Sequence, residues 1–298
     1  MKKTRGELAA AVLRLPASIN SDISAASDAL YRDLHPGPPA GEILRDLQYG
    51  PHSRNRLDLH LPSSAHAAQS WVLFVHGGGY VRGDKTQPGL FYYDNVGSWA
   101  ARHGMVGAVM TYRLAPEHAW PSAAQDIAAA VSWLCAQAEE HGIDPSRIFL
   151  MGHSAGAAHA AGYLAGHGGP AAPQLGLAGC ILLSGTYDLV ARTPNTAYFG
   201  DDVTQYAARS SIGGLARSGV ALLLGVAEAD PPPIQQQFVL AQQAVLSEGR
   251  PLPHVVHAGG HNHYTIVNHL GTADSTDTVM SDRILDFISA QHANALEA

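Results

Sequence analysis

A chain of 298 residues, 46% of them hydrophobic and 14% charged, is long enough to bury a large core in one domain. Its formal net charge of −7 at pH 7 argues against general binding to nucleic acids or anionic membranes, since either would require a concentrated basic face. The 31 glycines and 18 prolines are spread through many short segments, with no fixed-period repeat and no low-complexity tract.

The cysteines and the N-terminus indicate a reducing compartment. Cys135 and Cys180 lack CxxC spacing, and we expect both to be buried apolar side chains. Residues 1–5 resemble the basic start of a signal peptide, but Glu7 and Arg14 interrupt the apolar stretch that follows. No run of about 18 apolar residues marks a transmembrane helix. We therefore expect a cytoplasmic protein.

The elements predicted along the chain are those of an α/β protein. Residues 1–40 have the alanine-rich composition of a helical arm, and residues 41–298 predict one catalytic domain that opens with a hairpin of strands 43–49 and 56–61. Short apolar runs then alternate with helical patterns, which favours a mostly parallel sheet flanked by helices. The expected strands are Trp71 to Val75, Val106 to Thr111, Ile148 to Met151, Gly179 to Leu183, Val220 to Val226 and Leu252 to His257.

The irregular stretch from Tyr187 to Gly219 separates two of these strands and is too long for an ordinary connection. We expect it to form a small helical cap over the functional site, with a contribution from the N-terminal arm. Three helical patterns that flank the sheet show one apolar face at a period near 3.6. Their stripes are centred on Ile127 to Ala138, Ile234 to Val245 and Met280 to Ile288.

Gly152-His153-Ser154-Ala155-Gly156 is the most informative motif, because it joins a buried-strand run to an alanine-rich helix start. A serine in such a strand-to-helix turn is held with its hydroxyl above the sheet, as the nucleophile of a hydrolase requires. We therefore predict that Ser154 is the nucleophile. A plain turn between a strand and a helix is the alternative.

His76-Gly77-Gly78-Gly79-Tyr80 directly follows the strand at 71–75, and its glycines allow the backbone amides to turn inward. We predict an oxyanion hole made by the backbone N–H groups of Gly78, Gly79 and Ala155, supported by the N-terminal dipole of the helix after the serine. A simple flexible loop is the alternative for the glycine run.

These two motifs and the segment Tyr112-Arg113-Leu114-Ala115-Pro116-Glu117-His118 together resemble the hormone-sensitive-lipase-like branch of the α/β-hydrolases, over nearly the whole chain after residue 40. The resemblance implies an eight-stranded sheet, a lid of helices and carboxylester hydrolysis through an acyl-enzyme, with no cofactor. His153 stands where this branch often has Asp. Together with Tyr80, that departure also makes the chain similar to bacterial carboxylesterases and kynurenine-formamidase-like hydrolases.

The triad order in this fold is Ser, acid, His, so the acid should follow the penultimate core strand and the base the last one. Asp230 lies after the strand at 220–226, and Asp230-Pro231 resembles the Asp-Pro pair at the acid position of the family; Glu228 is the alternative. His261 follows a glycine pair after the strand at 252–257, and we predict it as the general base, with His263 as its rival.

The pocket and the partners are less sharply defined by the sequence. We expect Tyr80, His153 and Tyr187 to line the substrate pocket. A metal site at His261, His263 and His269 is a weaker hypothesis, because no established ligand motif accompanies them and it leaves the serine motif unexplained. We expect no metal and no cofactor, a small ester and water as partners, and neither nucleic acid nor a membrane span. A homodimer is left open.

The sequence thus favours a carboxylesterase-type serine hydrolase. An amidase or arylformamidase with the same triad is the first alternative, because the two differ mainly in how accurately the histidine delivers a proton to the leaving group. A non-catalytic ligand-binding α/β-hydrolase is the second, although all three triad residue types are present. Natural substrate and acyl length do not follow from the fold or the triad.

Overall fold

Eight strands form one sheet at the centre of this computed structural model, which describes residues 3–37, 41–63, 70–86, 92–138, 144–169, 177–272 and 279–297. The strands are β1 (Ile43–Gln48), β2 (Arg56–His60), β3 (Trp71–Val75), β4 (Val106–Met110), β5 (Ile148–His153), β6 (Leu177–Leu183), β7 (Leu222–Ala229) and β8 (His254–Asn262). Their spatial order is β1-β2-β4-β3-β5-β6-β7-β8. β2 pairs antiparallel with β1 and β4, and the pairs from β4 to β8 are parallel.

Helices connect and flank these strands. They are α1 (Arg5–Leu13), α2 (Ser21–Tyr31), α3 (Asp94–Arg102), α4 (Ser122–Gln137), α5 (Ala155–Leu164), α6 (Thr196–Phe199), α7 (Tyr206–Arg209), α8 (Ile212–Arg217), α9 (Pro232–Ser247), α10 (Thr265–Asn268) and α11 (Val279–Glu297), with short 3-10 turns η1 (Arg32–Leu34) and η3 (Val203–Gln205). This arrangement confirms the predicted fold class, a mostly parallel eight-stranded sheet flanked by helices.

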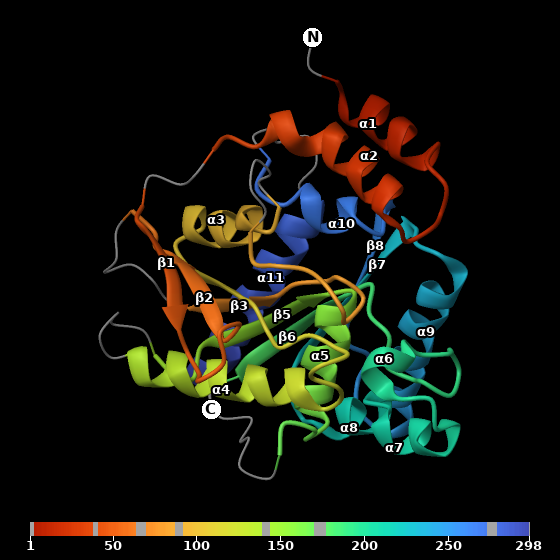
Figure 1. Ribbon diagram of the computed structural model, residues 1–298. Helices are drawn as coiled ribbons and strands as arrows, with labels where there is room; N and C mark the ends of the chain where they lie inside the picture. The colour runs from red at the N-terminus through yellow and green to blue at the C-terminus, as the bar shows by residue number, and fades with distance from the viewer. Residues whose placement is uncertain are drawn as a thin grey trace.

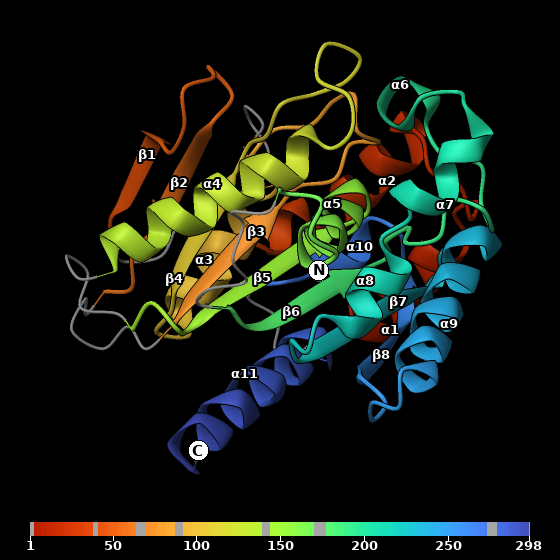
Figure 2. The same ribbon diagram turned by 90° about the horizontal axis from the view of Figure 1, so that it is seen from below.

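The central strands are apolar along their whole length because helices cover both faces of the sheet. All five residues of β3 and all five of β4 are buried. On one face, α4, α5, α8 and α9 pack against alternate strand residues such as Leu73 and Leu150. On the other face, Trp99 of α3 and Phe287 of α11 pack against the opposite set, which includes Phe149. Figures 1 and 2 show the two helical layers with the sheet between them.

The N-terminal arm, expected to be helical, contains α1 and α2, and residues 1–2 and 38–40 of it lie outside the described residues. α2 begins after Asn20, whose side chain accepts a hydrogen bond from the backbone N–H of Ile23. Figure 1 shows α1 and α2 beside α10 and the ends of β7 and β8. The two helices and η1 share a small core made of Leu8, Val12, Tyr31 and Leu34.

The segment predicted as a cap holds four short elements, α6, η3, α7 and α8, between β6 and β7. The largest departure from the predicted strands is at the last one. We expected it to end at His257, whereas β8 continues to Asn262. That difference decides where the loop after the strand begins, and it bears directly on the functional site.

Candidate active site

Ser154 lies between β5 and α5 in the strained backbone conformation that the motif predicts, with φ 55° and ψ −119°. The flanking glycines are required by close packing. A Cβ on Gly152 would lie 2.5 Å from the carbonyl oxygen of Gly156, and one on Gly156 would lie 2.0 Å from the carbonyl oxygen of Val75. The turn therefore packs directly on β3, and it presents the half-buried Ser154 side chain to a cavity.

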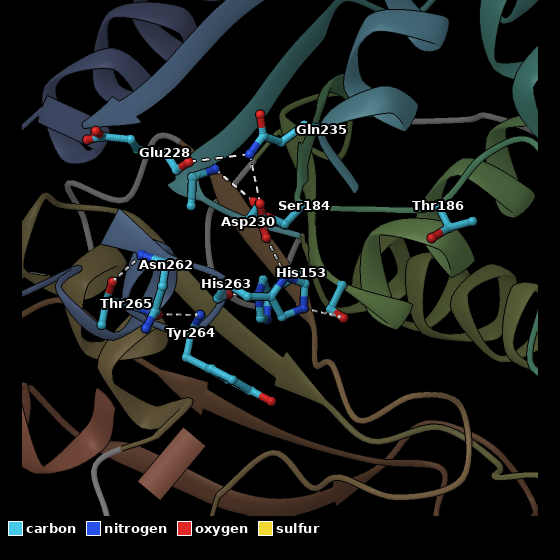
Figure 3. Close-up of polar contacts among 12 residues, drawn as sticks. His153, Ser184, Thr186, Glu228, Asp230, Gln235, Asn262, His263, Tyr264 and Thr265 are labelled. Atoms are coloured by element: carbon cyan, nitrogen blue, oxygen red, sulfur yellow. Dashed lines mark hydrogen bonds and ion pairs between the residues drawn. The ribbon is translucent and has the colours of Figure 1, made fainter. Parts of the chain in front are cut away.

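A serine, a histidine and a carboxylate form a continuous hydrogen-bonded chain at the carboxyl ends of β5, β7 and β8. Nε2 of His263 lies 2.8 Å from Oγ of Ser154, and Nδ1 of His263 lies 2.6 Å from Oδ1 of Asp230. Figure 3 shows the His263 ring pointing toward the Asp230 carboxylate, and Ser184 beside the other oxygen of that carboxylate. This geometry makes Ser154 the potential nucleophile, His263 the base and Asp230 the acid.

Asp230 is buried and fully bonded as a carboxylate. Its Oδ2 accepts hydrogen bonds from the hydroxyl of Ser184 at 2.6 Å and from the backbone N–H of Ala227 at 2.8 Å. Burial alone would raise the pKa of Asp230, but the charge and hydrogen bond of His263, with the other two donors, hold that pKa below its ordinary value. The carboxylate therefore stays ionised and can hold the His263 ring with Nδ1 protonated.

The prediction that His261 is the base is wrong, and its rival His263 occupies that position. Because β8 runs to Asn262, His261 still belongs to the strand and packs inward, 2% exposed, with Nδ1 3.1 Å from Oγ1 of Thr265. Its ring stacks on His269 at 4.2 Å. His263 is in the turn that follows the strand, where a side chain can reach over to Ser154.

The alternative acid, Glu228, does not touch the histidine. It is exposed, and its carboxylate accepts the backbone N–H of Gly260 at 2.7 Å, which ties the end of β7 to β8. Figure 3 shows the Glu228 side chain on the far side of Asp230 from His263. Of the two carboxylates, Asp230 is therefore the one that contacts the histidine.

The glycine loop lies beside Ser154 and has backbone conformations that favour glycine at two positions. Gly78 and Gly79 have φ values of 134° and 62°, and a Cβ on Gly78 would lie 2.0 Å from the carbonyl oxygen of Arg82. Both glycines and Ala155 line the same cavity as Ser154. Asn195, from the cap segment, donates a hydrogen bond to the carbonyl oxygen of Gly79 at 3.0 Å and so helps to fix the loop.

His153 links the glycine loop to the loop of the base. Its Nε2 lies 2.7 Å from the carbonyl oxygen of His263, and its Nδ1 lies 3.3 Å from the hydroxyl of Tyr93, which also accepts the N–H of Gly77 at 3.1 Å. Burial and the neighbouring charge of His263 lower the pKa of His153 to about 3. The neutral ring then donates from Nε2 and accepts at Nδ1, and it supports the triad from behind.

The catalytic chain opens into a cavity of about 630 Å³ between α2, the glycine loop and the cap segment. Tyr80 and His153 line it, as predicted, but Tyr187 does not. Tyr187, the first residue of the cap segment, is 2% exposed, and its backbone N–H donates to the side chain of Gln237. The chain turns inward after β6, so Thr186 faces the cavity in its place.

The histidines considered for a metal site are used otherwise. His263 contacts Ser154 and Asp230, whereas His261 stacks on His269. Within the described ranges, no three His, Cys, Asp or Glu side chains form a group able to hold a metal ion. None of the helices in that part of the chain combines the length and apolar character that a membrane span requires.

Two contributors to the site were not predicted from the sequence. Ser184 directly follows β6 and carries a positive φ of 52°, so a polar residue just after the carboxyl end of a core strand was a usable signal. Tyr93 immediately precedes α3, and its link to Gly77 and His153 depends on contacts across 16 and 60 positions. No local pattern in the sequence marks such a residue.

Comparison with known proteins finds similarity to several proteins named as esterases. The family model described as BD-FAE matches residues 57–169. An isoprenylcysteine alpha-carbonyl methylesterase of Arabidopsis thaliana is 36% identical over 116 residues, which are 39% of this chain and 26% of the relative. The carboxylesterase NlhH of Mycobacterium tuberculosis is 43% identical over 90 residues, 28% of this chain and 25% of the relative. The matched segments span about a quarter of the length of these relatives.

Solved structures match over much more of the chain. A bacterial heroin esterase aligns with a TM-score of 0.67 and 23% identity, over 96% of this chain and 97% of that protein. Esterase B of Lactobacillus rhamnosis, inhibited by a tributyrin phosphonate, aligns with a TM-score of 0.71 and 20% identity, over 92% and 94%. At these identities the likeness establishes the fold.

Proposed function

We propose that this chain is an α/β-hydrolase of the branch that resembles hormone-sensitive lipase, and that it acts as a serine hydrolase of small carboxylic esters. The observation that carries the proposal is the continuous contact from Ser154 through His263 to Asp230, at 2.8 and 2.6 Å, beside an open cavity. A binding module has no need of a strained serine held against an imidazole.

The proposed reaction begins with attack of the Ser154 hydroxyl oxygen on the ester carbonyl carbon. Nε2 of His263 accepts the hydroxyl proton, and the Asp230 carboxylate stabilises the imidazolium that forms. The N–H groups of Gly78, Gly79 and Ala155 are proposed to bind the developing oxyanion. His263 then gives its proton to the leaving alcohol, and a water molecule hydrolyses acyl-Ser154 by the same steps.

The cavity supports small dissolved substrates. Its volume of about 630 Å³ lies within the range of sites that enclose one small molecule, and α2 and residues 192–195 form part of its wall. We propose that the N-terminal arm and the insertion at 187–219 together act as the cap. Aryl esters with two to six acyl carbons should react well and triglyceride emulsions poorly, which kcat measurements on both substrates test.

An ester is preferred to an amide because an alkoxide or phenoxide leaves with little help, whereas an amine requires a well-placed proton from His263. The test compares kcat/KM for a short aryl ester, the matched anilide and N-formylkynurenine at one pH. A larger constant for the ester is expected. A larger constant for the formamide would make the chain an arylformamidase with the same triad.

A fluorophosphonate probe separates catalysis from mere ligand binding. The protein should incorporate one phosphonyl group on Ser154, and the Ser154→Ala variant should incorporate none. An unreactive native protein, with the same melting temperature as the variant, would favour a non-catalytic module.

A further inference from the structure

Four charged side chains outside the triad line the active-site cavity: Asp28, Arg32, Arg82 and Arg192. Asp28 accepts a hydrogen bond from Nε of Arg32 at 2.9 Å, so these two side chains neutralise each other. Among the described residues, neither Arg82 nor Arg192 has a carboxylate within ion-pair distance. The cavity therefore holds two positive charges that form no ion pair with any acidic side chain in the described part of the chain.

Arg192 is held in place on the cap side of the cavity. Its Nη1 donates to the hydroxyl of Thr186 at 2.7 Å, and Thr186 is itself 8% exposed. Burial raises the pKa of Tyr80 to about 12, while the charge of Arg192 and the Thr186 hydroxyl oppose that rise. The guanidinium thus lies near the Tyr80 phenol, and the contact with Thr186 leaves most of its five N–H donors for a ligand.

Arg82 adds a second charge from the other end of the glycine loop. It is exposed, and its charge opposes the rise that burial produces in the pKa of Tyr264, the residue after His263. Arg82 and Arg192 thus act on two tyrosines that both line the cavity with Ser154. The Asp230 carboxylate does not line this space, because it lies behind the His263 ring.

Arg82 and Arg192 give the cavity wall a local positive charge in a chain whose net charge is −7. Guanidinium groups pair with carboxylates through charge-assisted hydrogen bonds, and a concave wall strengthens the attraction. We propose that the substrate is an ester that also carries a carboxylate, which Arg192 binds directly and Arg82 attracts. This inference rests on the proposed esterase function for the reaction, but the anion site itself is testable by binding alone.

The test uses Ser154→Ala, which cannot turn over substrate, and pairs of esters that differ only in charge. Phenyl hydrogen adipate and its neutral amide, phenyl 5-carbamoylpentanoate, place the charge on the acyl side. 4-(Butanoyloxy)benzoate and 4-(butanoyloxy)benzamide place it on the leaving-group side. Calorimetry should give a Kd about tenfold lower for the acid of one pair, the scale of a partly exposed charge-assisted hydrogen bond. Raising the salt from about 0.05 to 0.5 M should reduce this preference.

When Arg192→Gln is added to Ser154→Ala, the Kd of the neutral ester and the Kd of the charged ester should agree to within about twofold. Arg82→Gln in the same background should lower the ratio of these two Kd values by a smaller factor. Arg217→Gln is the matched control, because Arg217 lies on α8 outside the cavity and pairs with Glu248. Equal Kd values within both ester pairs, or a preference that survives Arg192→Gln in a folded protein, would overturn the anion site. If the preference holds but the native protein neither hydrolyses the neutral esters nor reacts with fluorophosphonate, the proposed reaction fails and the anion site stands.

Discussion

Substitution of the two neighbouring histidines separates the base from a packing residue. His263→Ala removes the ring that contacts both Ser154 and Asp230, so kcat should fall by about 10³ to 10⁶ fold, the range found when a triad member is removed. His261→Ala removes a buried ring that contacts Thr265 and stacks on His269. It should leave kcat within about fivefold of the native value.

The stability effects should run the other way. His261 is 2% exposed, and loss of its hydrogen bond and packing should cost roughly 2 to 4 kcal/mol, or about 3 to 6 °C in melting temperature for a domain of this size. His263→Ala should lower the melting temperature less, since the ring faces a cavity on one side. The assay is steady-state hydrolysis of a short aryl ester, with calorimetric melting of each variant. A folded His261→Ala protein with kcat reduced a thousandfold, beside an active His263→Ala protein, would refute the assignment.

Three further results are expected. Asp230→Asn should lower kcat by about 10³ to 10⁴ fold, because the amide favours the wrong tautomer of His263, while Glu228→Gln should change kcat less than about threefold. A larger loss in Glu228→Gln would contradict the assignment of Asp230 as the acid. Burial lowers the pKa of His159 from 6.5 to about 3, so below about pH 6.5 the unfolded chain binds a proton that the folded protein does not, and the free energy of unfolding falls. In urea unfolding, His159→Phe should lose about 2 kcal/mol less stability between pH 7 and pH 5 than the native protein does. An equal loss in the two proteins would show that His159 does not cause the pH dependence. Gly156→Ala should destabilise the folded protein by about 3 kcal/mol, because the new Cβ would lie 2.0 Å from the carbonyl oxygen of Val75. Gly162→Ala is the control, because its Cβ would come no closer than 3.5 Å to another atom. Equal melting temperatures of the two variants would contradict the packing argument.

The sequence predicted the residues whose chemistry depends on local geometry. The turn around Ser154 was recognisable because a buried strand, two glycines and a helix start are adjacent in the chain. Asp230 was recognisable because the apolar run of β7 ends shortly before it and Pro231 precedes the first turn of α9. The expected parallel sheet followed from apolar strands that alternate with amphipathic helices.

The base was misplaced because Gly259 and Gly260 were interpreted as the start of a loop. Glycine weakens strands and is a common loop residue, yet here both lie within β8. A Cβ on Gly260 would approach the Cβ of Ala9 to 2.7 Å, and the pairing of β7 with β8 shifts register between Ala227 and Ala229. Glycine is thus favoured at position 260 because α1 packs closely there, about 250 positions away in the sequence. No local sequence pattern carries that information.

Tyr187 was misplaced for a related reason. An aromatic residue after a strand can face the cavity or the core, and the choice is made by Gln237 of α9, which binds its backbone 50 positions away. The lining of the cavity by Arg192 and Arg82 likewise depends on how the cap and the glycine loop meet.

The measurement that tests the central claim most directly is the mass of the protein quenched in acid during turnover of a short aryl ester. Acyl transfer through Ser154 predicts one added acyl group on the peptide that contains Ser154, formed in a burst with one equivalent of phenol and lost at the rate of turnover. The Ser154→Ala variant should show no such adduct. Turnover without any adduct under conditions that give a phenol burst, or an adduct on another residue, would contradict the account.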